Sequence, residues 1–150
     1  MSSAAVRRAI ADGTLEAVHR GTIEDTANRV VYYFEHHLRT MMNGTRIYHQ
    51  DNRHLADWRR PPSHHHSRSP VAVHFATLTT IGGCIYLRSL VGDLTQRIGV
   101  LNFACATQPG GGWRSGSRGQ EESIVRSSTL FYALESQTAK PFYDLHTINQ

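Results

Sequence analysis

The sequence predicts an α/β domain with a parallel sheet, and three patterns carry this prediction. Residues 71–78, VAVHFATL, alternate apolar and polar positions as a half-buried strand does. Residues 98–106, IGVLNFACA, form the nearly continuous apolar run that is typical of a strand covered on both faces. A helical pattern stands between these two segments and another follows them. Strands that alternate with helices in this way indicate a parallel sheet.

Length and composition indicate one folded domain over residues 1–150. A chain of 150 residues buries about two thirds of its unfolded surface on folding, which is enough for a single core. Hydrophobic residues make up 39% of the chain and charged residues 19%, which is the composition of a globular protein rather than of a disordered one.

The N-terminal region predicts two helical stretches followed by a segment of mixed character. Apolar residues in 3–20 recur at near-helical spacing, but Asp12 and Gly13 indicate a break, with Thr14 as the cap of a second helix. Residues 29–38, RVVYYFEHHL, are β-branched and aromatic at their start, which favours a strand, whereas their end fits a helix equally well.

Residues 50–70 predict a flexible insertion. The stretch has no hydrophobic periodicity and is rich in Pro, Ser, His and Arg. His64, His65 and His66 suggest a metal site at first sight. Metal ligands must converge from fixed positions, however, and consecutive side chains on a flexible loop diverge. We therefore predict no metal here, and no cofactor elsewhere in the chain.

The remaining elements are two helices. Residues 79–93 begin with a threonine cap and continue with apolar residues at helical spacing, although Gly82 and Gly83 weaken that helix by about 1 kcal/mol each. Residues 120–134 bring Ile124, Phe131 and Leu134 to one side of a second helix.

Charge and cysteine usage limit the classes of partner. The net charge of +4 favours anionic ligands, but the basic residues are scattered rather than arranged in a stripe, so we expect no direct nucleic-acid readout. Cys84 and Cys105 are too few for a disulfide framework and are expected to be buried thiols of a reducing compartment. No segment approaches the roughly 18 apolar residues of a membrane span. We expect an intracellular protein, in the cytoplasm or the nucleus, with no membrane partner.

A glycine-rich loop follows the second predicted strand. Residues 108–123, QPGGGWRSGSRGQEES, place this loop at the carboxyl end of a buried strand, where α/β sheets bind ligands. Glycine lets a ligand approach main-chain N–H groups, and the following helix adds positive charge at its N-terminus, so a phosphate or diphosphate would suit the loop. The residues match neither a P-loop nor a dinucleotide fingerprint. Taken alone, the loop is either a tight turn or a binding loop.

Glu121 and Glu122 stand in the first turn of the helix after this loop. Acidic residues there complement the helix dipole, and that contribution of about 0.3–1 kcal/mol accounts for them without any function. Beside a ligand loop, a carboxyl placed between an apolar wall, a like charge and a phosphate has a raised pKa, which suits a general acid. Neighbouring helical residues point about 100° apart, so one glutamate is expected to transfer protons and the other to orient the ligand.

At these residues the chain resembles the microbial-type poly(ADP-ribose) glycohydrolases, a branch of the macrodomain superfamily. The likeness lies in the order Asn-Phe-Ala, Pro-Gly-Gly-Gly, Gln-Glu-Glu and Arg-x-Ser-x-Leu within LNFACATQPGGGWRSGSRGQEESIVRSSTLFYAL. This combination is far more specific than any of its parts. The resemblance implies a three-layer α/β/α fold with a mixed, largely parallel sheet, and hydrolysis of ribose–ribose O-glycosidic bonds in poly(ADP-ribose) to release ADP-ribose, without metal or cofactor.

The same resemblance implies a role for each site residue. Glu122 would be the general acid, Glu121 would hold a ribose hydroxyl, and Gln120 would support the site. Asn102 would hydrogen-bond the distal ribose. The ribose and its diphosphate would be admitted by Gly110, Gly111 and Gly112. Poly(ADP-ribose) and ADP-ribosylated proteins would be the partners.

The chain also departs from the family pattern. Family members continue beyond the region of KPFYDLH with further strands and a second phosphate-binding loop, so this sequence looks like the N-terminal part of the family domain, without its C-terminal strands. That leaves the activity of the 150 residues alone in question. A catalytically silent ADP-ribose-binding module and an incomplete fragment are the alternatives to an active enzyme.

Overall fold

The structure is a computed structural model that describes residues 2–49, 51–56, 72–93 and 95–148. Its helices are α1 (Ser3–Arg20), α2 (Glu35–Gly44), α3 (Arg53–Ala56), α4 (Thr80–Val91), the 3-10 helix η1 (Trp113–Ser115), α5 (Gln120–Arg126), α6 (Leu130–Leu134) and α7 (Lys140–Ile148). Its strands are β1 (Thr22–Asp25) and β2 (Val30–Tyr33). The α/β class is therefore confirmed in its general form, as a mixture of helices with a small sheet.

The sheet between the described residues is a two-stranded antiparallel hairpin. Thr22 pairs with Tyr33 and Asp25 with Val30. The turn is held by Asp25, whose Oδ1 accepts hydrogen bonds from the backbone N–H groups of Ala27 and Asn28, each at 3.1 Å. The mixed segment 29–38 is thereby resolved into β2 followed by α2.

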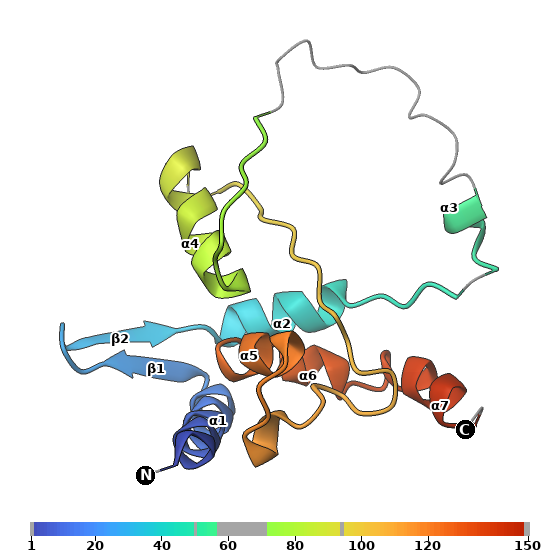
Figure 1. Ribbon diagram of the computed structural model, residues 1–150, viewed down its shortest axis with the longest axis horizontal. Coiled ribbons are helices and arrows are strands. Elements are labelled where there is room, and N and C mark those ends of the chain that lie inside the picture. Colours follow the sequence, from blue (N-terminus) through green and yellow to red (C-terminus); the bar gives the residue numbers. More distant parts are fainter. Residues whose placement is uncertain (1, 50, 57–71, 94, 149–150) are drawn as a thin grey trace.

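The core lies where α1, α2, η1, α5 and α6 meet, and Figure 1 shows α1, α2, α5 and α6 gathered in the lower part of the molecule. Its buried residues come from all five of these elements: Ala11, Val18, Leu38, Trp113, Val125 and Phe131. The glycine loop and the pair of glutamates are attached to this core.

The predicted break in the first helix is wrong, because α1 runs unbroken from Ser3 to Arg20. Ala11, at the middle of the helix, is fully buried. Tertiary packing outweighs the cost of about 1 kcal/mol that Gly13 imposes. The helix ends instead at Gly21, which has a left-handed φ of 67°.

The predicted helix over 120–134 is divided in two. α5 ends at Arg126, and α6 begins at Leu130 after a short turn. Within that turn, the Oγ of Ser128 accepts from the Leu130 N–H at 3.2 Å and donates to the Ile124 carbonyl at 2.8 Å. Serine competes with the helical backbone in this way, and so it favours a helix end over a helix interior.

The two strands that led to the prediction of a parallel sheet are not formed. Residues 72–78 and 98–106 belong to no strand, and in Figure 1 both run as long drawn-out segments to the right of α4. Leu101 and Phe103 are 73% and 70% exposed, which contradicts a strand covered on both faces. An apolar run predicts burial only where neighbouring strands and helices exist to cover it. The described part of this chain supplies no such cover.

The central helix is confirmed, and the predicted insertion is largely outside the described residues. α4 begins after Thr79, whose Oγ1 accepts from the Gly82 N–H at 3.1 Å, and it ends before Gly92. Within 50–70, residues 53–56 form α3 rather than loop, while residue 50 and residues 57–70 with their histidines are not among those described. No helix of the described chain is long and apolar enough to cross a membrane.

Candidate active site

The glycine loop reverses the chain through backbone conformations that only glycine adopts easily. Gly110 and Gly111 have φ values of 73° and 56°, in the left-handed region. The Gly111 N–H donates to the Gln108 carbonyl at 2.9 Å, which closes the first turn. A Cβ on Gly110 would lie 2.7 Å from Cδ1 of Trp113. The loop is therefore packed onto its own tryptophan, and the glycines serve both its conformation and its packing.

Gln120 fastens the start of α5 to the segment before the loop. Its Oε1 accepts from the Phe103 N–H at 2.9 Å, and its Nε2 donates to the Leu101 carbonyl at 2.9 Å. Nε2 also donates to the Oγ1 of Thr80 at 3.1 Å. The Gln120 amide thus joins α5 to the start of α4 and to residues 101–103.

Glu121 points inward and is held by the same segment. Glu121 is only 2% exposed. Oε1 accepts from Nδ2 of Asn102 at 3.1 Å, and Oε2 accepts from the Cys105 N–H at 2.7 Å. The structure therefore brings Glu121 and Asn102 together. The Oδ1 of Asn102 is buried without a hydrogen-bond partner among the described residues.

Glu122 lies against the glycine loop instead. Its Oε1 accepts from the Gly112 N–H at 3.2 Å. A Cβ on Gly111 would come within 2.6 Å of that same oxygen, and a Cβ on Gly119 would collide with Oε2. Gly111 and Gly119 therefore clear the space that this carboxyl occupies. The neighbouring glutamates lie in different surroundings, one buried in the segment of Asn102 and the other on the loop.

Trp113 is part of the core, which the sequence did not indicate. It is 1% exposed and packs on Phe131 with ring centroids 5.0 Å apart. Its carbonyl accepts from Nη1 of Arg126 at 3.4 Å. An aromatic residue between glycines and arginines looks like a loop residue, and only the packing of the loop onto α6 shows otherwise. The tryptophan is therefore not an exposed loop residue.

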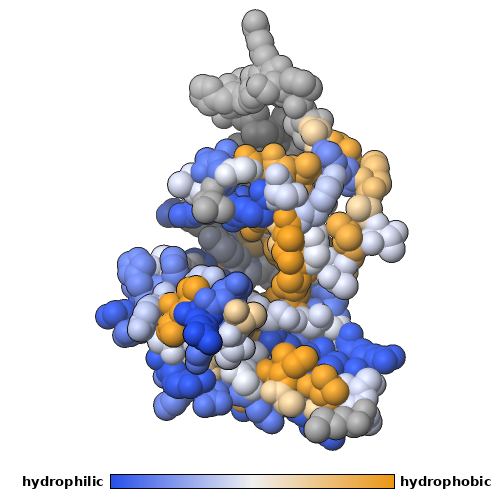
Figure 2. Space-filling model, turned by 90° about the vertical axis from the view of Figure 1, so that its left-hand side faces the viewer, coloured by the Kyte–Doolittle hydropathy of each residue, from blue (hydrophilic) through white to orange (hydrophobic). Residues whose placement is uncertain are grey.

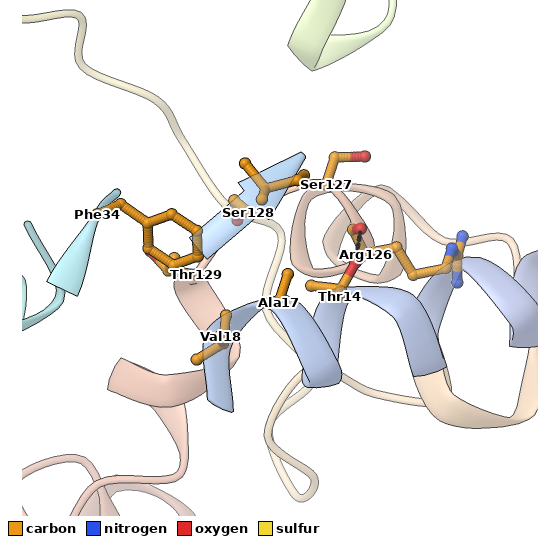
Figure 3. A pocket seen from close by; sticks show the side chains of 9 residues that line it. Thr14, Ala17, Val18, Phe34, Arg126, Ser127, Ser128 and Thr129 are labelled. Atoms are coloured by element: carbon orange, nitrogen blue, oxygen red, sulfur yellow. Dashed lines mark hydrogen bonds between the residues drawn. The ribbon is translucent and has the colours of Figure 1, made fainter. Parts of the chain in front are cut away.

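Helix α1 contacts both the glycine loop and the end of α5. Nε of Arg7 donates to the Gly116 carbonyl at 2.5 Å, and a Cβ on Gly116 would lie 2.6 Å from the Ala4 carbonyl oxygen. Oγ1 of Thr14 donates to the Arg126 carbonyl at 2.5 Å, drawn as a dashed line in Figure 3. The first helix therefore fixes the end of the loop and the end of α5. Sequence reasoning missed these contacts because they join residues more than a hundred positions apart.

A cavity of about 250 Å³ lies beside this contact, between α1 and the turn after α5. Figure 3 shows Ala17, Phe34 and Thr129 among the side chains around it. Its lining does not include the glutamates. We assign the candidate site to the glycine loop and the glutamate pair, because polar groups converge there whereas this cavity is mostly apolar.

Two further ionisable groups lie near Glu121. Burial raises the pKa of Tyr143 to about 12, and the negative charges of Glu121 and Cys105 add to the effect. Backbone hydrogen bonds from Thr107 and Gln108 lower the pKa of the Cys105 thiol, against the opposing effects of burial and of Glu121. Both cysteines are partly exposed, so the prediction of buried thiols is wrong.

Arg126 is buried beneath Glu122. It is 6% exposed, and burial lowers the pKa of its guanidinium. The charge of Arg7 lowers that pKa further, whereas the carboxylate of Glu122 raises it. A buried cation one turn from Glu122 thus contributes positive charge below the loop. Among the described residues, no group of three or more His, Cys, Asp or Glu side chains is placed to hold a metal ion.

Comparison with known proteins identifies the family. Residues 11–150 match the sequence model of the microbial-type PARG catalytic domain, where PARG is poly(ADP-ribose) glycohydrolase. The chain therefore belongs to the microbial-type PARG catalytic domain family. A comparison with curated proteins gave no match.

Solved structures agree with this assignment. The chain is similar to a crystal structure of PARG from Thermomonospora curvata, with 30% sequence identity and a TM-score of 0.81 over 96% of this chain and 50% of that one. A crystal structure of PARG from the same organism bound to the inhibitor ADP-HPD matches with 30% identity and a TM-score of 0.77, over 97% of this chain and 48% of that one. The chain thus spans about half the length of the solved structures that it matches.

Proposed function

We propose that this protein is a poly(ADP-ribose) glycohydrolase that hydrolyses ribose–ribose O-glycosidic bonds and releases ADP-ribose. The observation that carries the proposal is the placement of Glu121 and Glu122 in different surroundings beside a loop cleared by glycines. Family membership and the inhibitor-bound PARG of T. curvata support poly(ADP-ribose) as the substrate class. ADP-ribosylated proteins would carry that substrate. The two free cysteines support an intracellular location, in the cytoplasm or nucleus.

In this proposal Glu122 is the general acid. In its protonated form it gives its proton to the glycosidic oxygen of the leaving ribose while the bond from the anomeric carbon to that oxygen breaks. Water then adds to the anomeric carbon, and the Glu122 carboxylate takes one of its protons, which restores the acid. The Gly112 N–H donates to one carboxyl oxygen, so the Glu122 side chain is already ordered before the reaction begins.

Glu121 and its neighbours orient the sugar. The buried Glu121 carboxylate would accept a hydrogen bond from a ribose hydroxyl, and Asn102 would bond the distal ribose. Gly110, Gly111 and Gly112 would admit that ribose and its diphosphate. The diphosphate would stabilise the positive charge that develops on the sugar ring in the transition state. Gln120 keeps the segment of Asn102 at the start of α5.

The finer fold is part of the same proposal. A three-layer α/β/α arrangement with a mixed, largely parallel sheet would require residues 72–78 and 98–106, which form no strand in this structure, to pair as neighbouring strands. Their patterns of apolar residues support that arrangement. The carboxyl end of the second strand would then lead into the glycine loop, where such sheets bind ligands.

The test is ADP-ribose release from poly(ADP-ribose) by the chain, by Glu122→Gln and by Glu121→Gln, with circular dichroism to verify folding. Glu16→Gln is the matched control, since Glu16 is an exposed glutamate of α1 that pairs with Arg20. Loss of a general acid costs roughly 10²- to 10⁴-fold in rate, so Glu122→Gln should fall at least about a hundredfold below the control. Release that survives in Glu122→Gln would refute its role.

Calorimetry with ADP-ribose separates the remaining alternatives. A folded parent that binds ADP-ribose without releasing any from the polymer would be a catalytically silent binding module. A folded parent that neither binds nor releases ADP-ribose would be an incomplete fragment of the family domain.

A further inference from the structure

Helix α5 carries the charged side chains that are buried in the described part of the chain. They are Glu121 and Arg126, which are 2% and 6% exposed. Charged side chains normally lie at the surface, and Figure 2 shows hydrophilic residues spread over much of the lower part of the molecule, at the height of α1 in Figure 1. Burial of a charge costs free energy unless hydrogen bonds or an opposite charge compensate it. Each of these two residues therefore needs such partners.

The partners of Glu121 account for its burial, whereas those of Arg126 do not. Both carboxyl oxygens of Glu121 accept hydrogen bonds, one from Nδ2 of Asn102 and one from the Cys105 N–H. The guanidinium of Arg126 has several N–H donors, but within the described chain it makes a single hydrogen bond, from Nη1 to the Trp113 carbonyl. That bond is 3.4 Å long, beyond the usual range of about 2.7–3.2 Å. Arg126 is therefore a buried cation with little compensation.

A second arginine lies close to Arg126 and increases the cost of burying it. Nε of Arg7 in α1 donates to the carbonyl of Gly116, the residue that follows η1. Burial lowers the pKa of Arg126, and the charge of Arg7 lowers it further. Among the residues that the structure describes, neither arginine forms an ion pair with a carboxylate. Stability does not explain this arrangement, because an apolar side chain would fill the position of Arg126 at a lower cost.

Glu122 is the negative group on which Arg126 acts. The two residues are four positions apart in α5, so their side chains leave the helix on the same side. Besides burial and Arg7, which lower the pKa of Arg126, the carboxylate of Glu122 raises it. The loop also connects the two side chains, because its neighbouring residues Gly112 and Trp113 bond Glu122 and Arg126 respectively. Arg126 therefore acts on Glu122 through its charge and through the loop.

We propose that Arg126 is a positioning residue for Glu122, which it serves by holding the loop at Trp113 and by stabilising the Glu122 carboxylate that forms during the reaction. This role rests on the proposed function, in which Glu122 is the acid. The O–H bond of Glu122 breaks as its proton moves to the glycosidic oxygen, and that oxygen keeps the electron pair of the broken bond to the anomeric carbon. The negative charge left on Glu122 interacts strongly with a buried cation, because the effective dielectric constant is lower there than in water. The positive charge of Arg126 is thus compensated at the step that needs it.

The experiment compares two leaving groups. In poly(ADP-ribose) the leaving group is a ribose oxygen, which needs a proton as its bond breaks. An ADP-ribose that carries 4-nitrophenol in the same linkage releases a stable phenolate and does not need that proton. A smaller fraction of folded protein lowers both rates equally, whereas a poorly placed acid lowers only the rate on the polymer. The ratio of the two rates therefore separates positioning of the acid from support of the fold.

Arg126→Met is the main variant, because methionine removes the charge and retains an unbranched apolar side chain. Release from the polymer should fall at least about tenfold, while release of nitrophenol should stay within about threefold of the parent. The variant should unfold at a temperature no lower than that of the parent, since removal of an unpaired buried charge does not destabilise a core. The matched control is Arg39→Met on α2, where Arg39 is exposed and pairs with Glu35. Both of its rates should stay within about twofold of the parent.

Arg126→Lys is the second variant, because lysine retains the positive charge without the guanidinium. Since Arg126 makes one long bond rather than a bidentate contact, lysine should keep release from the polymer within about fivefold of the parent. Three results would overturn the role of Arg126. They are equal losses on both substrates in Arg126→Met, a lower unfolding temperature of Arg126→Met than of the parent, and a loss in Arg126→Lys as large as in Arg126→Met.

Failure of this role is distinguishable from failure of the proposed function. A folded parent that cleaves neither substrate refutes the proposed function, and the role of Arg126 with it. An active parent whose Arg126→Met variant behaves like Arg39→Met refutes the role of Arg126 alone and leaves the proposed function in place. Glu122→Gln is the reference for loss of the acid, and it should show the same pattern as Arg126→Met with a larger loss on the polymer.

Discussion

The two parts of this molecule differ in what holds them in place. Around the glycine loop, backbone and side chains are fixed from several directions: Trp113 is buried, and Arg7 bonds the loop's end. Around α4, no residue of the helix itself is buried, and its flanking segments 72–79 and 95–103 belong to no sheet. The comparison teaches that the two regions meet at residues 101–105, which are largely uncovered and yet bond both Gln120 and Glu121. The glutamates owe their positions to α1, α5 and the loop itself, together with hydrogen bonds to residues 101–105.

The difference in stability between the two parts should be largest when one aromatic residue of each part is replaced by alanine. Trp113→Ala empties a fully packed position of the core and should lower the free energy of unfolding by about 3–5 kcal/mol, the usual cost of removing a large aromatic residue. Phe75→Ala removes a 95% exposed ring and should change the free energy by no more than about 0.5 kcal/mol. Urea unfolding followed by circular dichroism measures both. Equal effects would mean that the two parts are not as different as the structure shows.

A second pair of substitutions tests how tightly α1 holds the loop. Gly116 and Gly92 both have left-handed backbones, with φ values of 87° and 68°. Alanine at Gly116 would place its Cβ 2.6 Å from the Ala4 carbonyl oxygen, whereas at Gly92 it would meet nothing within 4 Å. Strain costs about 1–2 kcal/mol at either site, and overpacking adds about 1–3 kcal/mol at Gly116 alone.

Thermal unfolding of the two variants is the measurement. Gly116→Ala should unfold at a clearly lower temperature than Gly92→Ala. The opposite order would show that α1 does not press on the loop. If both variants match the parent, neither left-handed backbone is maintained in solution.

What the sequence predicted well lies close together in the chain. The loop after residue 106 and the cap at Thr79 follow from turn chemistry and helical geometry over a few residues. Glu121 and Glu122 have different hydrogen-bond partners, and the division of labour between them remains a prediction. The likeness to the family was also readable, because its residues are contiguous.

What the sequence did not predict depends on distant contacts or on polypeptide that must cover a surface. Gly13 argued for a broken helix, but burial of Ala11 keeps α1 straight. Trp113 carried no sign of burial, because its partner Phe131 lies on a later helix. The run IGVLNFACA predicted a covered strand, and this prediction is wrong. An apolar run is buried only where other strands and helices cover it, and the described chain has none at this position.

The tyrosine near the site gives a prediction in pH. The pKa of Tyr143 is raised to about 12 in the folded state, against an ordinary value near 10. Its stabilising contribution is fully present below about pH 10 and is lost as the pH rises through about 12, because only the unfolded chain releases the proton between these values. Unfolding by urea should therefore become easier across that interval. Tyr143→Phe should reduce this pH dependence, and Tyr33→Phe, on an exposed residue, should not. An unchanged slope in Tyr143→Phe would contradict the buried environment.

The smallest effects compare two glycines inside helices. A Cβ on Gly13 in α1 or on Gly83 in α4 would meet nothing within 4 Å, and neither residue has a left-handed backbone. Alanine at either position raises helix propensity by up to about 1 kcal/mol. In α1 this gain should appear in full as a higher unfolding temperature, since α1 is part of the core. In α4 the gain should be much smaller in the main transition, because no buried residue ties α4 to the core. Equal gains would show that α4 unfolds together with the rest of the chain, and α4 would then be held more firmly than its exposure indicates.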